Sequence, residues 1–253
     1  MTNKRLTNSF LLALAVIMAG AVIASCNHKR GSEAESLEFD GYRKWAFIDE
    51  IAETDFVLIN DVLWATHNIN TPDTFTENPE DVGMFYQWNK NIGWSSTDPI
   101  INSNNDTIWD TSISVGTYLE GVNDPSPSGY RLPTADELYS LLDTVNVLHV
   151  WTTVNGVQGA KFVDKSNGNM IFLPITGYRY CDDGRLYEPS DYLYGIYWSS
   201  TRCEYDSNFA YCLYFSRTDG ICKHTSRCDN GNTIRCVMDK GTFLLKNLAI
   251  PPR

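Results

Sequence analysis

The chain has 253 residues and a formal net charge of −11, from 20 lysines and arginines against 31 aspartates and glutamates. Hydrophobic residues make up 43% and aromatic residues 13% of it, enough to bury a core, so a wholly disordered chain is excluded. The acidic balance argues against a nucleic-acid partner, because binding to a phosphate backbone needs clustered lysine and arginine.

The first 25 residues have the pattern of an export signal. Lys4 and Arg5 precede a nearly uninterrupted apolar run over 10–23, which is shorter than the roughly 20 residues that cross a bilayer as a helix. The run leads into Ile23-Ala24-Ser25-Cys26, which resembles the lipobox of bacterial lipoproteins. The resemblance implies a signal peptide over 1–25 and a diacylglycerol, with further acyl chains such as palmitate, on Cys26. An ordinary export signal and an uncleaved anchor are the alternatives.

The expected address is the bacterial outer membrane, with the protein lipid-anchored and exposed at the cell surface. Several acyl chains hold a protein stably in a membrane, whereas one alone is marginal. In lipoproteins of this kind an aspartate after the cysteine favours the inner membrane, and here Asn27 follows. Residues 26–47 contain small, polar and acidic side chains and are predicted to form an acidic, solvated tether.

The tether is followed by a segment with strand and turn patterns. Residues 56–59 and 62–65 predict two strands around a tight turn at Asn60-Asp61. The polar segment 95–115 has no periodicity and is interpreted as an irregular loop. Thr134 and Glu137 match a capping box, and leucines follow at helical spacing, so we expect a helix of about ten residues beginning at Thr134.

The second half reads as further strands bounded by Gly, Asn, Asp or Ser. They are predicted at 162–163 and 170–173, which form a hairpin, and at 196–198, 209–215 and 234–238. Together these patterns predict one α+β domain over 48–240, followed by a C-terminal extension over 241–253.

Six cysteines besides Cys26 lie in the last third of the chain. An even number in an exported protein favours disulfides, although the sequence does not choose among the pairings. Free thiols and a zinc site stay open, but no C-x2-C pair is present. The candidates are Cys181, Cys203, Cys212, Cys222, Cys228 and Cys236.

Four segments, in order and spacing, resemble a known family. They are Val62-Leu63-Trp64-Ala65 with Gly83-Met84-Phe85-Tyr86-Gln87-Trp88, then Asn123-Asp124-Pro125-Ser126-Pro127-Ser128-Gly129-Tyr130-Arg131-Leu132-Pro133-Thr134, Gly195-Ile196-Tyr197-Trp198-Ser199-Ser200-Thr201, and Ile234-Arg235-Cys236-Val237. Over residues 57–239 the chain is similar to the Fibrobacter succinogenes major paralogous domain, found in lipoproteins and surface proteins of Bacteroidota.

The resemblance implies an α+β, C-type-lectin-like fold, with mixed, mostly antiparallel sheets, one or two helices and long irregular loops. This fold is shared with formylglycine-generating enzymes, and no general activity comes with the family. The chain departs from the family at Ser126, where many members carry a cysteine that apparently pairs with the cysteine of the final strand. The family's bridge to Cys236 therefore does not transfer.

No hydrolase, zinc-protease, phosphate-loop or dinucleotide motif is present in the sequence. Cys222 and Cys228, with Cys236 downstream, loosely resemble the copper-binding thiols of formylglycine-generating enzymes. A disulfide-stapled loop is the alternative. Loop carboxylates before Trp198 indicate possible calcium binding, against a plain solvated acidic loop.

Seven tyrosines fall within residues 178–205, where they offer rigid contact area with a polar tip or, alternatively, fill a core. We expect a non-catalytic protein that binds a glycan or a surface protein through these loops and has no cofactor, with bound calcium as the alternative. A fimbrial accessory subunit and a formylglycine-type thiol or copper oxidase are the alternatives. The candidate binding residues are Tyr178, Tyr180, Asp182, Asp183, Tyr187, Glu188, Asp191 and Tyr192, beside loops 203–208 and 217–232.

Overall fold

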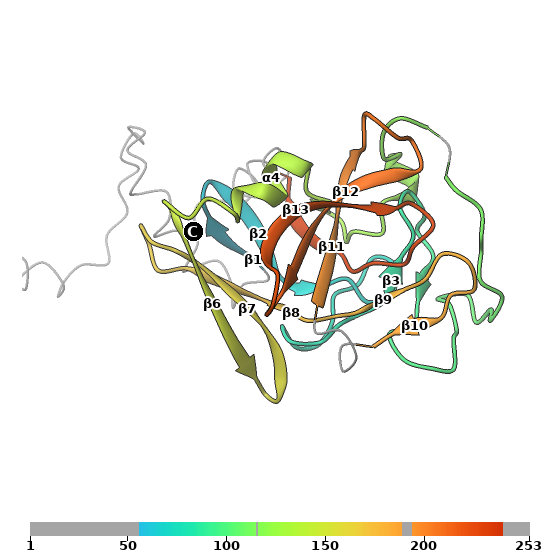
Figure 1. Cartoon of the computed structure of the whole chain (residues 1–253), viewed down its shortest axis with the longest axis horizontal. Helices are drawn as coiled ribbons and strands as arrows, with labels where there is room; N and C mark the ends of the chain where they lie inside the picture. Colours follow the sequence, from blue (N-terminus) through green and yellow to red (C-terminus); the bar gives the residue numbers. More distant parts are fainter. Residues whose placement is uncertain (1–55, 115, 189–193, 240–253) are drawn as a thin grey trace, which may run out of the picture. The chain divides into compact units, whose positions relative to one another are not determined.

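The structure, a computed structural model, describes residues 56–114, 116–188 and 194–239 (Figure 1). All described residues belong to one unit of the chain, 49–253. The expected signal peptide, tether and C-terminal extension lie outside the described residues. So do three candidate residues, Cys26, Asp191 and Tyr192.

A four-stranded antiparallel sheet joins the beginning and the end of the described chain. Its order is β1 (Phe56–Ile59), β2 (Val62–Asn68), β14 (Arg235–Met238) and β5 (Tyr130–Arg131). The predicted turn between β1 and β2 is confirmed, because Asn60 and Asp61 both have the positive φ that a two-residue hairpin turn of type I′ requires.

Three long strands form a second antiparallel sheet, which Figure 1 shows in orange and red. They are β11 (Tyr194–Arg202), β12 (Phe209–Ser216) and β13 (Gly220–Arg227), in that order. The predictions for β11 and β12 are confirmed, but β13 was expected to be a loop. Three consecutive residues at its centre, from Cys222 to His224, are exposed, so this edge strand lacks the alternating apolar pattern by which strands are recognised.

A third antiparallel sheet consists of β6 (Val147–Val154), β7 (Val157–Asp164) and β8 (Met170–Pro174). The β7–β8 hairpin confirms a prediction, whereas β6 was not expected. Strand β6 is an edge strand with mostly half-buried or exposed side chains, and a second positive-φ turn, Asn155-Gly156, joins it to β7.

Short elements complete the described chain. Two small hairpins are formed by β3 (Phe85–Tyr86) with β4 (Gly93–Trp94) and by β9 (Tyr178–Arg179) with β10 (Leu186–Tyr187). The 3-10 helix η1 covers Gly121–Asn123.

The predicted capping box is confirmed, but the helix it begins is shorter than expected. Helix α4 spans Ala135–Ser140, with Thr134 as its N-cap and Glu137 bonded back to the Thr134 backbone. The C-cap of the helix is Leu141. The Leu141 N–H donates to the backbone oxygen of Tyr139, which makes a tighter turn than an α-helix does. Leu138 and Leu141 are fully buried, so the apolar face is packed although the helix has only six residues.

The expected α+β, C-type-lectin-like fold is wrong. Antiparallel β-sheets dominate the described residues, which hold only one short α-helix and one 3-10 turn. Segment 220–227, which was interpreted as part of a loop, and segment 147–154, for which no element was predicted, are both eight-residue strands. The added strands and the shortened helix together move the domain from the α+β class to a β-rich one.

The main core lies where the three large sheets and α4 meet. It contains fully buried Trp64, Leu138, Phe162, Phe215 and Val237, each from a different element. Large side chains of this kind contribute about 2–3 kcal/mol each on burial. Within the described ranges no helix is both long and apolar enough to cross a membrane.

Candidate functional site

Half-buried tyrosines from two sheets form one continuous row, which we call the tyrosine row. It comprises Tyr180, Tyr187, Tyr178, Tyr194 and Tyr214. Tyr178 and Tyr187 stack with ring centroids 4.8 Å apart and planes 12° apart. The remaining neighbours lie 5.7–5.9 Å apart in tilted or edge geometries, which aromatic pairs favour.

Strand register places these rings together. Tyr178 pairs with Tyr187 across the β9–β10 hairpin. In the neighbouring sheet Ile196 pairs with Tyr214, and Tyr194 lies two residues before Ile196 on the same face, because side chains alternate along a strand. His224 continues the row from β13, with its ring centroid 5.5 Å from that of Tyr214.

Tyr178, Tyr194 and Tyr214 of the tyrosine row border a groove of about 410 Å³. Ile196, Phe209 and Cys212 supply apolar lining from the sheet β11–β13. The other lining residues, apart from the tyrosines, are polar: His224, Thr225, Ser226, Arg227 and Asn230. This size and this mixture of many apolar contacts with a few polar groups are typical of small-ligand sites.

Arg179 anchors the β9–β10 hairpin, which carries Tyr178 and Tyr187 of the tyrosine row. Its guanidinium is fully buried and donates to the backbone oxygens of Ser95, Thr97 and Gly184 at 2.7 Å each. It also forms an ion pair with Asp98 at 3.2 Å. Gly184 has a φ of +70° and space for no side chain, since a Cβ would lie 2.7 Å from Trp109. The bonds of Arg179 thereby tie the β9–β10 hairpin to the loop that contains Ser95, Thr97 and Asp98.

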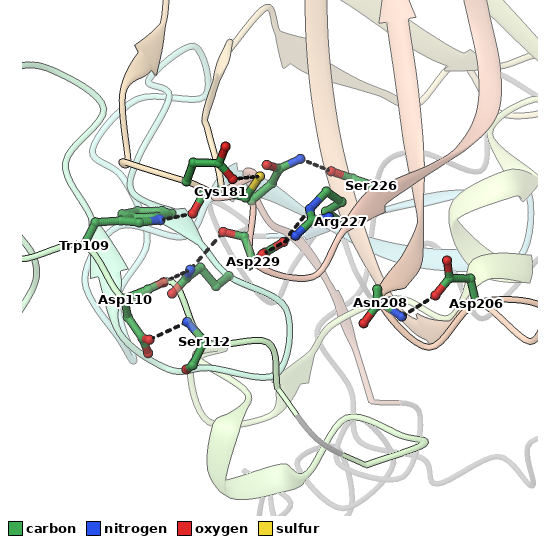
Figure 2. A network of polar contacts seen from close by, with 12 residues as sticks. Trp109, Asp110, Ser112, Cys181, Asp206, Asn208, Ser226, Arg227 and Asp229 are labelled. Atoms are coloured by element: carbon green, nitrogen blue, oxygen red, sulfur yellow. Dashed lines mark hydrogen bonds and ion pairs between the residues drawn. The ribbon is translucent and has the colours of Figure 1, made fainter.

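A polar network joins three loops (Figure 2), and two of its residues, Ser226 and Arg227, line the groove. Arg227 donates to both carboxylate oxygens of Asp229, at 3.0 and 2.7 Å. The backbone oxygen of Asp229 accepts from Gln87, and Trp109 donates to the backbone oxygen of Cys181 at 2.8 Å. The bonds to Asp229 raise the Arg227 pKa and outweigh the opposing effect of burial, so this guanidinium stays charged and paired.

The structure brings together some of the predicted site residues and separates others. Tyr178, Tyr180 and Tyr187 are in the row. Asp182 and Asp183 are exposed and accept bonds within their own turn, from the Cys181 thiol and the Arg185 backbone.

The described members of the acidic group, Asp182, Asp183 and Glu188, form no cluster that could hold a metal ion. Glu188 is exposed beyond β10. No group of three or more His, Cys, Asp or Glu positioned for a metal occurs in 56–114, 116–188 or 194–239. Asp191 lies outside these ranges, so its place relative to the others is not described.

Sequence reasoning missed Tyr214 as a site residue, and it included His224 and Asn230 only as part of the flanking loop 217–232. Tyr214 could have been found, because alternation along 209–215 places it with Cys212 on one face. His224 belongs to the strand that was interpreted as a loop. Asn230 reaches the groove through a loop whose course no local pattern predicts.

All six candidate disulfide cysteines are thiols in the structure, and their pairing stays a prediction. Burial raises the pKa of Cys228 to about 12 and raises those of Cys212 and Cys236 further. Since the thiolate is the reactive form, these buried thiols are poor nucleophiles.

The thiols of the proposed copper site are far apart. Cys222 and Cys228 are six residues apart along and just beyond β13, which corresponds to roughly 20 Å of extended chain. Cys236 lies in another sheet, on β14. The described geometry does not gather these three sulfurs around one ion.

Ser126 lies directly against Cys236. Its Oγ is 3.0 Å from the Cys236 Sγ, and both side chains are buried. The position at which the chain departs from the family pattern is thus in contact with the cysteine of the final strand.

The chain has no significant match among protein-family models, curated proteins or solved structures.

Proposed function

We propose that the protein is a lipid-anchored protein of the bacterial outer-membrane surface that binds a glycan or protein ligand along the tyrosine row, without catalysis. The observation that carries this proposal is the continuous row of half-buried rings along a groove. Half-buried tyrosines expose area for contact while their rigid rings lose little conformational freedom on binding.

The surroundings of the row favour binding over chemistry. The carboxylates near it are engaged in local turns, and the thiol that lines the groove, Cys212, is buried with a raised pKa. Arg179 and the Arg227–Asp229 pair hold the flanking loops in place, so the surface is pre-organised and less ordering entropy opposes association.

Membership of the Fibrobacter succinogenes major paralogous domain family is part of this proposal. The 3.0 Å contact between Ser126 and Cys236 supports it, because the family's cysteine at that position apparently pairs with the cysteine of the final strand. The lipobox at Cys26 supports the membrane address.

The binding surface is tested with the full-length protein in detergent, screened against a glycan array and against surface extracts. Tyr178→Ala removes the ring at the centre of the row, and Tyr205→Ala removes a tyrosine that is 86% exposed and does not line the groove. We expect Tyr178→Ala to weaken the detected ligand and Tyr205→Ala to leave it unchanged. Equal affinities for the wild type and both variants would overturn the proposal.

A further inference from the structure

The charges around the groove point to a neutral ligand. The charged side chain lining it is Arg227, whose guanidinium is held by both oxygens of Asp229. Among the described residues no carboxylate lines the groove, so these residues present no negative charge to a cationic ligand there. The net charge of −11 further disfavours an anionic ligand approaching from solution.

The polar groups of the groove suit a ligand rich in hydroxyls. The His224 Nδ1 accepts a bond from the Thr225 N–H at 2.6 Å, which places the ring proton of the neutral imidazole on Nε2 as a donor. The Asn230 amide donates one N–H to the Ser226 Oγ at 3.1 Å, while its Oδ1 has no partner among the described residues. These groups retain hydrogen-bonding capacity that the described part of the protein does not use.

The rings supply the complementary apolar contact. Tyr214 directs its hydroxyl to the Asp219 carboxylate at 3.0 Å, so its role at the groove is that of a flat ring. An aromatic face is electron-rich and attracts the C–H bonds of a saturated ring. A cavity of about 410 Å³ suits a small ligand, whereas a stable protein interface needs about 800 Å² from each partner.

We propose that the groove binds a neutral oligosaccharide, with a sugar ring against Tyr214 and its hydroxyls bonded to the polar side that carries His224 and Asn230. This inference rests on the proposed function, because it names the ligand class of the same site.

The test uses the full-length protein in detergent and a panel of neutral gluco-, manno- and chito-tetrasaccharides, with uronic-acid and sulfated oligosaccharides for comparison. Affinities are measured by calorimetry for the wild type and four variants, which are Tyr178→Ala, Tyr214→Ala, Tyr214→Phe and Tyr205→Ala. We expect Tyr214→Ala to weaken binding of a neutral oligosaccharide by about tenfold or more, because the ring contact is lost. Tyr214→Phe keeps the ring and is expected to stay within about threefold of the wild type.

Tyr205→Ala is the matched control for loss of an exposed ring outside the groove, and a thermal melt of each variant checks that it is folded. Binding of charged oligosaccharides only, or of a protein ligand only, through Tyr178 and Tyr214 would overturn the sugar inference and leave the proposed function intact. If a neutral oligosaccharide binds the wild type, Tyr178→Ala and Tyr214→Ala with equal affinity, the sugar inference and the proposed function are both overturned. Both are also overturned if no ligand of any class binds.

Discussion

Glu137 joins the start of helix α4 to strand β5 through two kinds of bond. Its carboxylate accepts two bonds of 2.7 Å from the Arg131 guanidinium and one of 2.9 Å from the Thr134 backbone. Burial by itself would raise the pKa of Glu137, but the bonds to Arg131 and Thr134 outweigh it and lower the pKa below the ordinary 4.5. The ionised form is therefore favoured in the folded state.

We predict that Glu137→Gln lowers the free energy of unfolding at neutral pH by about 1 kcal/mol, because the half-exposed ion pair is lost while an amide can still cap the helix. Since the folded-state pKa is the lower one, the wild-type carboxylate stabilises the fold above pH 4.5 and loses this effect as the pH falls through the folded-state pKa. Urea unfolding of both proteins should show a difference at pH 7 that disappears at strongly acidic pH.

Asp136→Asn is the control for that experiment, because Asp136 is an exposed acid in the same first turn and forms no ion pair within the described residues. A difference between wild type and Glu137→Gln that persists unchanged in acid would contradict the role given to the carboxylate.

Ser126 offers a second test at the scale of single residues. Because its Oγ lies 3.0 Å from the Cys236 Sγ, we predict that Ser126→Cys forms a disulfide with Cys236 on oxidative folding. The bridge would link positions 110 residues apart and raise the free energy of unfolding by up to about 4–5 kcal/mol. Peptide mapping without reduction should recover the two segments linked.

Ser126→Ala serves as the comparison, since it removes the hydroxyl and leaves Cys236 a buried thiol. If the folded Ser126→Cys protein yields the introduced cysteine and Cys236 as two unlinked thiols, the two positions are not in contact. That result would remove the main structural support for the family resemblance.

At the scale of elements, the β9–β10 hairpin depends on one buried cation. We predict that Arg179→Met lowers the free energy of unfolding by about 2–4 kcal/mol, because three backbone oxygens lose charge-assisted bonds inside the protein. It should also weaken ligand binding, since Tyr178 and Tyr180 flank Arg179. Urea unfolding and a binding titration measure the two effects.

Arg185→Ala is the matched comparison for Arg179. Arg185 is exposed and lies over the Tyr187 ring at 4.8 Å, so its loss should cost less than about 1 kcal/mol. Equal destabilisation by the two substitutions would contradict the anchoring role of Arg179.

Elements with a strong local signal were predictable from the sequence. The Asn60-Asp61 turn and the Thr134 capping box each depend on neighbouring residues, and both are present. Strand β13 was not predictable, because its exposed Cys222–Lys223–His224 centre is fixed by pairing with β12 and not by an apolar pattern. For the same reason His224 was expected in a loop within 217–232 and not on a strand, whereas Tyr178, Tyr180 and Tyr187 were named individually because of their crowding in sequence.

The groove itself was beyond sequence reasoning. Its walls come from β9, β11, β12, β13 and the loop at Asn230, and the contacts among them are long-range. The sequence spacing of Cys222 and Cys228 also did not indicate their distance in space. Six residues along an extended strand place the two thiols far apart, so the loosely predicted copper site is not assembled there.

At the scale of the whole molecule, we propose a lipid at Cys26 and a binding face on the β-rich unit. We predict that the wild-type protein incorporates a fatty-acid probe and sediments with membranes, and that Cys26→Ser abolishes both. The substituted protein should still bind the ligand, because the groove is built from residues 178–230. An unlabelled wild-type protein in the soluble fraction would contradict the anchor.

The most direct test of the binding face is amide hydrogen exchange of the full-length protein, with and without a saturating concentration of the ligand that the array selects. We predict slower exchange in 178–187, which begins with the groove residue Tyr178 and carries two further rings of the tyrosine row, and in 220–230, which supplies the polar side of the groove. We expect no change in β6, which belongs to another sheet. Slower exchange confined to β6 or to any segment away from the tyrosine row, with 178–187 and 220–230 unaffected, would contradict this prediction.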